Sequence, residues 1–366
     1  MWLQLVLIFI AFVVCQIVQG NGDTPKQRHK FVVFLTIALI LQSALRHLAV
    51  GADTYAYYMK FLEVEKESWD AIFRKMYETY ILSDGKDAGY ALLQKCFSSI
   101  IPSFRAFMFF VAVVFFVPLC RLAEKTLKSS AELFLFFCLY QAIFYDFFSV
   151  TGMRQTLATV ALLVGIKYIE KNKLIKFLII ALIASLIHKS ALLIIPFYFV
   201  AKLPKSKYIL LVSLFALPFI IPRARELAML MAEMSASDQY MYYIDNSYET
   251  SGAINFLLFL AGGSILIAFA KWRNNTSVPD LFVNACALGL LFAPLTWVDP
   301  TLMRVGQYFS LLTLMAIPMG VYNLGTSKGT RNILVYGLVL LAIVTIIRHG
   351  APYTFFWNEM QLGANY

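Results

Sequence analysis

Residues 174–201 read L-I-K-F-L-I-I-A-L-I-A-S-L-I-H-K-S-A-L-L-I-I-P-F-Y-F-V-A, an apolar run with a histidine, a lysine and a serine near its middle. As one helix the run would be about 42 Å long, which exceeds the ~30 Å hydrocarbon core of a bilayer. Two short helices hinged at His188–Ser190, with Pro196 loosening the second, accommodate the polar interruption. The run therefore predicts a broken helical hairpin inside a membrane protein.

The rest of the chain is equally apolar. Its 366 residues are 60% hydrophobic and 14% charged, a balance that soluble domains do not show. Apolar stretches of about 20 residues match the thickness of a bilayer, and with the hairpin they predict an all-α polytopic bundle of about 11–12 spans. We expect a single transmembrane domain over 1–366. The windows lie near 2–20, 31–50, 104–120, 131–149, 153–170, 174–201, 208–221, 253–271, 280–298, 304–323 and 332–349.

The residues responsible for the net charge of +10 lie mainly between the predicted spans. Lysines cluster in short segments between apolar runs, as the positive-inside rule predicts for cytoplasmic loops, and no soluble basic domain exists to bind nucleic acid. All such clusters can be cytoplasmic only if 174–201 begins and ends on that side. A single long helix, with the lysines of 202–207 outside, stays open as the alternative. The six clusters centre on Lys26–Lys30, Arg121–Lys128, Lys167–Lys173, Lys202–Lys207, Lys271–Arg273 and Lys328–Arg331.

This threading makes 51–103 and 222–252 the two large outer loops and leaves the N-terminus and the tail 350–366 outside. The segment 69–82 predicts a helix lying in the membrane interface. A second short amphipathic helix is expected near 228–234, ahead of a tyrosine cluster. The face predicted for the first helix consists of Trp69, Ile72, Phe73, Met76 and Tyr80.

Eight of the twelve arginines fall on or near the outer face in this topology. Arginine is costly within a bilayer and its planar fork suits phosphate and carboxylate groups, so the convergence indicates an anionic ligand there. The eight are Arg46, Arg74, Arg105, Arg154, Arg223, Arg225, Arg304 and Arg348.

Two of these arginines stand out because they open spans. A positive side chain opposes the dipole at a helix N-terminus, so Arg154, followed by Gln155, is better explained by a bound anion than by capping. Arg304 opens a later span in the same way, four residues before Tyr308. Arg46 and Arg348 lie at outer ends of spans, where snorkelling to lipid headgroups explains them equally well.

Three residues could act on protons. Asp53 follows the second span directly and could be a base, a sugar ligand or an arginine partner, with a loop cap as the alternative. Asp87 is favoured as a helix N-cap. His188 interrupts an apolar run, where a neutral imidazole could take a proton from a sugar hydroxyl, or bond a free carbonyl at the hinge.

The sequence contains no motif for metal binding, nucleotide binding or proteolysis. The five cysteines lack the spacing of a zinc site or a disulfide framework, and no nucleotide-binding loop or metalloprotease motif is present, so we expect no metal and no cofactor. Tyrosines of the outer loops could stack on sugar rings or anchor the protein at the interface. The candidates are Tyr55, Tyr90 and Tyr243.

A series of short motifs resembles the EpsG family of Wzy-like polysaccharide polymerases. The motifs run in family order from about residue 50 to 310, and R-Q-x-L-A followed by H-x-S-A is the most specific pair. Asp87 departs from the family, which usually has Glu before the Gly-Tyr pair. The motifs are G-A-D-T-Y-A-Y-Y at 51–58, D-A-G-Y-A-L-L at 87–93, G-M-R-Q-T-L-A at 152–158, A-S-L-I-H-K-S-A-L at 184–192 and R-V-G-Q-Y-F at 304–309.

The resemblance implies a membrane glycosyltransferase with a GT-C-like helical bundle. Such a polymerase joins oligosaccharide repeat units carried on undecaprenyl diphosphate at the outer face of the bacterial cytoplasmic membrane, and works beside flippase and chain-length regulator proteins. Its product could be a capsule, an exopolysaccharide or an O-antigen.

The resemblance also gives the candidate residues roles. It implies that arginines bind the diphosphate, chiefly Arg154 and Arg304, with Arg46 or Arg348 as an additional ligand. His188 would be the base, with Asp53 orienting or replacing it. Gln155 and Tyr308 would contact sugar or support the site.

Two other functions stay open. A glycosyltransferase could transfer one sugar from a polyprenyl phosphate with Asp53 as base. A flippase or exporter would need polar groups at the bilayer midplane, where this chain has almost none.

Overall fold

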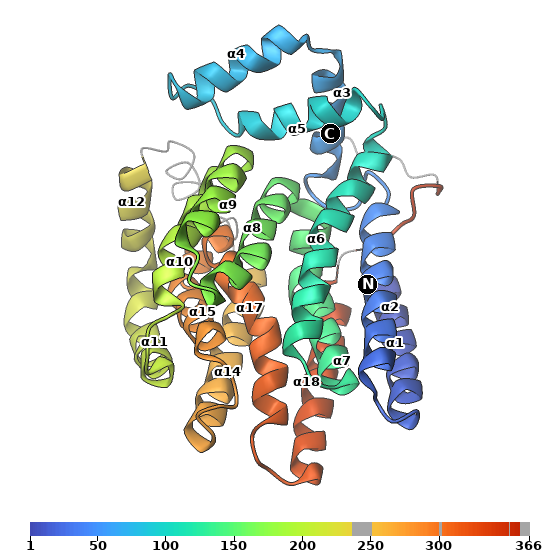
Figure 1. The fold of residues 1–366 in the computed structure, drawn as a ribbon, viewed down its shortest axis with the longest axis vertical. Helices are drawn as coiled ribbons and strands as arrows, with labels where there is room; N and C mark the ends of the chain where they lie inside the picture. Colours follow the sequence, from blue (N-terminus) through green and yellow to red (C-terminus); the bar gives the residue numbers. More distant parts are fainter. Residues whose placement is uncertain (236–250, 300–301, 351, 359–366) are drawn as a thin grey trace. The chain divides into compact units, whose positions relative to one another are not determined.

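The computed structural model describes residues 1–235, 251–299, 302–350 and 352–358. Within these ranges the regular elements are helices, apart from one isolated bridge between Arg46 and Phe355 (Figure 1). Eight helical segments of the described residues are long and apolar enough to cross a membrane. The predicted all-α polytopic fold is confirmed. The eight segments are Trp2–Gly20, Phe104–Thr126, Ser130–Thr151, Ser206–Leu230, Ile254–Arg273, Asp280–Val298, Met303–Tyr322 and Lys328–His349.

The broken run at 174–201 forms as predicted. Helix α9 (Leu174–Ile187) ends before His188, whose backbone is extended at φ −154° and ψ 115°. The 3₁₀ helix η2 (Lys189–Leu193) starts at the next residue and packs against α9, and helix α10 (Ile194–Val200) follows it. Neither α9 nor the η2–α10 segment is long enough to count among the eight long spans. The polar residues at 188–190 therefore mark a real break.

Two further windows predicted as spans form helices without reaching the apolarity of the eight. Helix α2 (Pro25–Ala44) begins with a capping box, in which Thr24 and Gln27 exchange hydrogen bonds and Pro25 occupies the first turn. Helix α8 (Met153–Glu170) carries Arg154 in its first turn and is largely buried.

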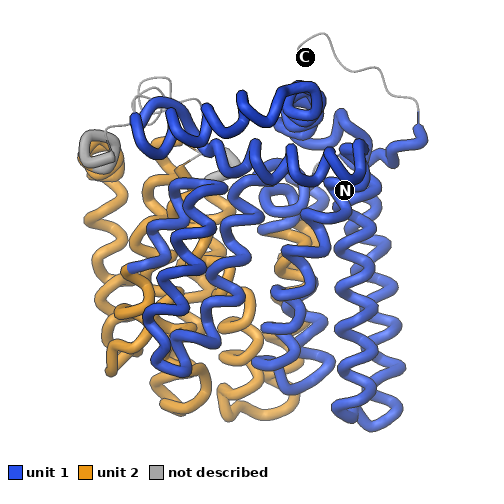
Figure 2. The backbone as a smooth tube through the Cα atoms, turned by 45° about the horizontal axis from the view of Figure 1, so that its top comes forward, with its two compact units in different colours: residues 1–137, 144–195, 346–366 blue, residues 138–143, 196–345 orange. Residues whose placement is uncertain are grey.

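The chain divides into two compact units (Figure 2). Unit 1 comprises residues 1–137, 144–195 and 346–366, and unit 2 comprises 138–143 and 196–345. The prediction of one transmembrane domain stays a prediction. Besides α2, α8, α9 and η2, the described part of unit 1 contains α1 (Trp2–Gly20), α3 (Thr54–Lys66), α4 (Trp69–Tyr80), α5 (Ala88–Ser98), α6 (Phe104–Thr126), most of α7 (Ser130–Leu139) and most of the π-helical η1 (Tyr140–Thr151).

Unit 1 combines a row of long helices with a cover of short ones. Helices α1, α2, α6, α8 and α9 pack in that order, each against the next. Helix α5 packs on α9 and α6, while α3 and α4 pack on α5. Figure 1 shows α3, α4 and α5 lying across one end of the long helices of this unit. That covered end holds the candidate site.

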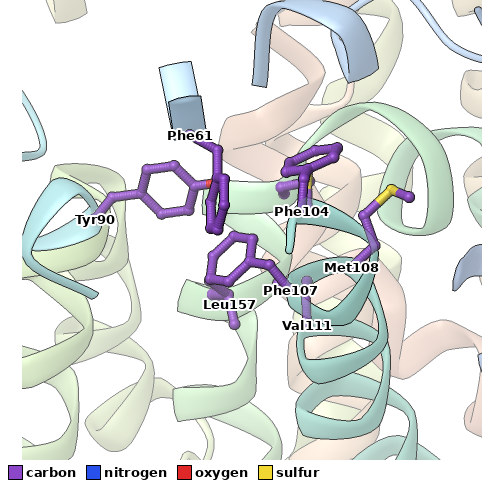
Figure 3. Close-up of a cluster of buried hydrophobic side chains, with 8 residues drawn as sticks. Phe61, Tyr90, Phe104, Phe107, Met108, Val111 and Leu157 are labelled. Atoms are coloured by element: carbon purple, nitrogen blue, oxygen red, sulfur yellow. The ribbon is translucent and has the colours of Figure 1, made fainter. Parts of the chain in front are cut away.

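An aromatic cluster joins the cover to the long helices (Figure 3). Phe61 of α3 and Phe107 of α6 are fully buried, with ring centroids 5.5 Å apart. Tyr90 of α5 packs edge-on against Phe107, and Leu157 of α8 completes the contact. Burial of each large side chain contributes roughly 1.5–3 kcal/mol, so the cluster fixes α3 and α5 on the bundle.

Unit 2 is a second helical bundle. Helix α17 packs against α14 and α15, and α11 packs against the same two helices. Helix α17 is the most deeply buried of the long spans. Besides α10, the unit contains α11 (Ser206–Ile220), η3 (Ile221–Arg223), α12 (Ala224–Ser235), α14 (Ser251–Arg273), α15 (Asp280–Phe292), α16 (Leu295–Val298), α17 (Met303–Tyr322) and most of α18 (Lys328–His349).

The two helices predicted in the outer loops are present as α4 and α12. Burial varies across the face expected for α4, because Ile72 is fully buried whereas Trp69 and Phe73 are exposed. The Trp69 ring lies 5.9 Å from the Lys95 ammonium of α5, so part of this face is directed toward the neighbouring helix. The place of α4 in the membrane interface stays a prediction. Tyr243 and the tyrosines around it lie outside the described residues.

Candidate functional site

Asp87 occupies the N-cap position of α5, as the sequence indicates, but its carboxylate does not cap that helix. Its backbone is left-handed at φ +49°, which turns the side chain away from α5. Oδ2 accepts hydrogen bonds from Arg154 at 2.8 Å and from His188 Nδ1 at 3.1 Å, and Oδ1 accepts from the Lys189 N–H at 3.3 Å. One buried carboxylate thus gathers residues from three elements.

His188 lies at the break between α9 and η2. Its backbone groups are used locally, since its N–H donates to the Ala184 carbonyl and its own carbonyl accepts from Ala191. The pairing of Nδ1 with Asp87 favours the tautomer that carries its proton on Nδ1, which leaves Nε2 as an acceptor. The side chain is 19% exposed. This imidazole is oriented, partly accessible and able to accept a proton.

Arg154 lies in the first turn of α8, two residues after Gly152, the N-cap of that helix. The guanidinium pairs with Asp87 and also donates to the Tyr57 hydroxyl. Its side chain is 36% exposed, so a ligand can approach it. The negative charge of Asp87 offsets the unfavourable position of a cation at a helix N-terminus.

The charge of Asp87 is secure at neutral pH. Burial alone would raise the pKa of this carboxyl, but the hydrogen bonds from His188 and the Lys189 amide and the charge of Arg154 outweigh burial. The pKa of Asp87 therefore lies below its ordinary value. A permanent carboxylate holds His188 and Arg154 together, and because both contact the same oxygen atom, the base and the cation are neighbours.

A hydrogen-bonded latch places Asp87 at the end of α9. The Tyr80 hydroxyl of α4 donates to the Leu186 carbonyl and accepts from the Gly89 N–H at 3.0 Å. A Cβ at Gly89 would come within 2.4 Å of the Leu186 carbonyl oxygen, so only glycine permits this approach of α5 to α9. The glycine of the D-A-G-Y motif is explained by packing.

Arg46 lies in unit 1 but serves a different purpose. It is 1% exposed, and its guanidinium donates to the carbonyls of Ser43 and Val150 and to the hydroxyl of Thr54. Val150 lies near the end of η1, where the wide π-helical turn leads into α8. The expected diphosphate role is untested, but these contacts support the backbone ahead of Arg154 and we do not include Arg46 in the site.

The other predicted residues of unit 1 have varied positions. Asp53 is half-buried at the N-cap of α3, and the acid that contacts His188 is instead Asp87. Tyr55 packs against Tyr58, with ring centroids 6.1 Å apart. Gln155 is buried in α8, and Arg348 is exposed in the last turn of α18.

Arg304 and Tyr308 belong to α17 of unit 2. Arg304 is half-buried in the first turn of that helix, and Tyr308 is fully buried one turn later. The predicted convergence of Arg304 with Arg154 stays a prediction. No group of three or more His, Cys, Asp or Glu side chains suited to a metal ion occurs within the described ranges.

Sequence reasoning missed three contributors: Asp87 as the partner of His188, Tyr57 beside Arg154, and Tyr80 in the latch. Their signals are weak, because contacts between distant helices depend on packing. Only the glycine directly after Asp87-Ala88 hinted at a close approach.

A comparison with protein families decides the relationship. The EpsG family model matches residues 29–358, nearly the whole chain. The chain belongs to the EpsG family. Members of the EpsG family are Wzy-like polymerases, so this is a membrane protein of the polysaccharide polymerase type. No curated protein and no solved structure matches the chain.

Within this EpsG family chain, the matched region includes every residue of the Asp87 site. The motif residues Asp87, Gly89, Arg154 and His188, which are far apart in sequence, meet in one place. That meeting is what the motif order alone could not reveal.

Proposed function

We propose that this protein joins oligosaccharide repeat units carried on undecaprenyl diphosphate, at the outer face of the bacterial cytoplasmic membrane. The observation that carries the proposal is the single oxygen of Asp87 shared by His188 and Arg154. It places a proton acceptor beside a group suited to phosphate oxygens, which glycosyl transfer from a lipid diphosphate requires.

His188 acts on the acceptor. Its Nε2 takes the proton of a sugar hydroxyl while the hydroxyl oxygen forms a bond to the anomeric carbon of the donor. Asp87 fixes the imidazole through Nδ1 and stabilises the positive charge that develops on it. In this role Asp87 replaces Asp53, which the sequence had favoured.

Arg154 acts on the donor. The bond between the anomeric carbon and the diphosphate oxygen breaks, and the lipid diphosphate leaves with the bonding electrons. A guanidinium stabilises the charge that gathers on the leaving oxygens. Its exposed part can reach a ligand while Asp87 holds the rest. Arg304, in unit 2, is proposed as a second diphosphate ligand, and flippase and chain-length regulator proteins as partners.

The test uses purified full-length protein with the lipid-linked repeat unit of its own organism, with and without a chelator. A ladder of products that differ by one repeat unit supports polymerisation. Addition of one sugar from a polyprenyl phosphate, or movement of the lipid across vesicles without bond formation, would refute it.

An Arg154→Lys variant tests the diphosphate role. Lysine keeps the positive charge but cannot reproduce the planar fork, so we expect kcat/KM for the lipid-linked donor to fall roughly ten- to a hundredfold. Arg74→Lys is the matched control, because Arg74 is exposed on α4 and is not part of the site. A folded Arg154→Lys variant with the wild-type rate would remove Arg154 from the mechanism.

A further inference from the structure

A hollow lies at the end of unit 1 opposite Asp87. Helices α2 and α6 begin or end there at Pro25 and Thr126, whereas their other ends, Ala44 and Phe104, are on the side of the candidate site. The hollow has a volume of about 440 Å³, within the range of roughly 300–1,000 Å³ common for small-molecule sites. Its lining includes Arg28, Lys125, Lys128, Glu124, Leu127 and Leu133.

Hydrogen bonds between loops hold the rim of this hollow in place. The Asp23 carboxylate accepts the Ser130 N–H at 3.1 and 3.3 Å, which joins the α1–α2 turn to the start of α7. Arg28 donates to the Lys128 carbonyl, and the Lys128 N–H donates to Glu132 at 2.8 Å. The basic residues are therefore carried on a fixed frame.

Some charged side chains of the rim form ion pairs and others do not. Glu124 pairs with His29 at 2.8 Å, and Lys125 pairs with Glu170 at 2.5 Å. Lys128 is exposed and forms no ion pair with any residue that the structure describes. Arg28 uses a neutral carbonyl as its hydrogen-bond partner, and the buried Glu132 carboxylate is the acidic group that interacts with the charges of Arg28 and Lys128. Three basic side chains and one acidic side chain line the hollow, so the lining itself is net positive.

Exposed apolar side chains of α2 beside the hollow favour a lipid over a soluble anion. Leu127 and Leu133 are almost completely buried beneath the basic rim. Helix α2, which forms one wall, exposes Val33, Ile37 and Leu41 further along its length, where an acyl chain can lie. The hollow lies at the level where apolar spans end, which is the depth of lipid headgroups.

We propose that this hollow binds the phosphate headgroup of an anionic phospholipid. Arg28 and Lys128 contact the phosphate, Lys125 adds charge at the rim, and the exposed apolar residues of α2 contact an acyl chain. This assignment is independent of the polymerase reaction, since it concerns the opposite end of unit 1 and its test measures binding alone.

The experiment measures lipid binding to purified full-length protein by native mass spectrometry and by thermal stabilisation in neutral detergent. Phosphatidylglycerol is the probe, phosphatidylcholine is the neutral lipid, and inorganic phosphate is the soluble anion. We expect retention of phosphatidylglycerol and a higher Tm, neither of which the other two probes produce. Equal stabilisation by inorganic phosphate or by phosphatidylcholine would overturn the proposal.

Two variants test the residues. Lys128→Gln removes a charge without touching the hydrogen bonds of its backbone, and Lys125→Gln loses only an exposed pair. Each should weaken phosphatidylglycerol binding roughly fivefold, the effect of one basic residue near an anionic headgroup. Lys171→Gln is the matched control, an exposed lysine that does not line the hollow. Equal weakening by the control, or none by either test variant, would show that no specific site exists.

Discussion

Replacement of Asp87 by Asn is the perturbation that most sharply separates a structural role of this residue from a functional one. The variant keeps the size of the side chain but removes the charge that holds Arg154 and His188. Loss of hydrogen bonds to a charged group costs roughly 1–3 kcal/mol, and the partial exposure of Arg154 places the cost toward the lower end. A folded protein has ~5–15 kcal/mol of stability, so the variant remains folded at 25 °C.

The effect on activity should be much larger. A positioned general base contributes typically 10²–10⁴-fold to a rate, and the amide of Asn can turn its NH₂ toward His188 and favour the wrong tautomer. We therefore expect the kcat of Asp87→Asn to fall about a hundredfold or more while Tm falls by only a few degrees. A role confined to folding predicts a rate close to the wild-type value.

The assay follows the rate of product-ladder formation at saturating lipid-linked repeat unit, with Tm measured on the same preparation. Asp84→Asn is the control, because Asp84 is exposed in the same loop. Asp87→Glu keeps the charge at the position where the EpsG family usually has Glu, and should retain more activity than the Asn variant. If folded Asp87→Asn polymerises within about threefold of the wild-type rate, well short of the loss expected for a base, the assignment of His188 and Asp87 fails.

Three further predictions concern stability. Gly89→Ala should lower the free energy of unfolding, measured by chemical denaturation, by ~1–3 kcal/mol, because its Cβ would meet the Leu186 carbonyl. The control is Gly337→Ala in α18, whose Cβ would meet no atom within 4 Å, so this variant should be as stable as the wild type or more stable. Tyr90→Phe should raise Tm, because the buried Tyr90 hydroxyl has no hydrogen-bond partner among the described residues and its removal recovers ~1 kcal/mol. A lower Tm would show that this hydroxyl does form a hydrogen bond. Because the pKa of Asp87 is lower in the folded protein, its contribution to stability is present above the unfolded pKa of 3.8 and is lost as pH falls through the folded value. The Tm difference between wild type and Asp87→Asn should accordingly shrink below pH ~4, and a constant difference down to pH ~2.5 would contradict the shift.

The sequence predicts the helices well because each depends on local patterns. The break at His188 follows from polar residues in an apolar run, and α12 follows from its apolar spacing. Contacts between distant segments are harder to foresee. Asp87 has the local features of an N-cap, and its actual partners depend on how closely α5 approaches α9. The uneven burial of α4 has the same origin, because only packing shows that Ile72 is enclosed while Trp69 and Phe73 stay exposed.

Arg46 illustrates a second limit. The sequence places it at the outer end of a span, where it resembles the other arginines of that region. Arg46 is held inside the protein because its guanidinium donates to the carbonyl of Val150, near the end of η1. A π-helical turn such as η1 leaves no clear signal in the sequence. Arg154 and His188 stand out in the sequence because each differs from its surroundings, one as a cation at a helix N-terminus and the other as a polar residue within an apolar run.

The oxygen atom that Arg154 and His188 share makes them competitors for one charge. A diphosphate that draws the guanidinium toward itself would leave the Asp87 carboxylate to the imidazole alone. The imidazolium that forms as His188 takes a proton would then have the full charge of its partner. Before the donor arrives, that stabilisation is divided, and a water molecule reaching Nε2 meets a less effective base. The site would thus work as an interlock in which arrival of one substrate enables attack by the other, without movement of any helix.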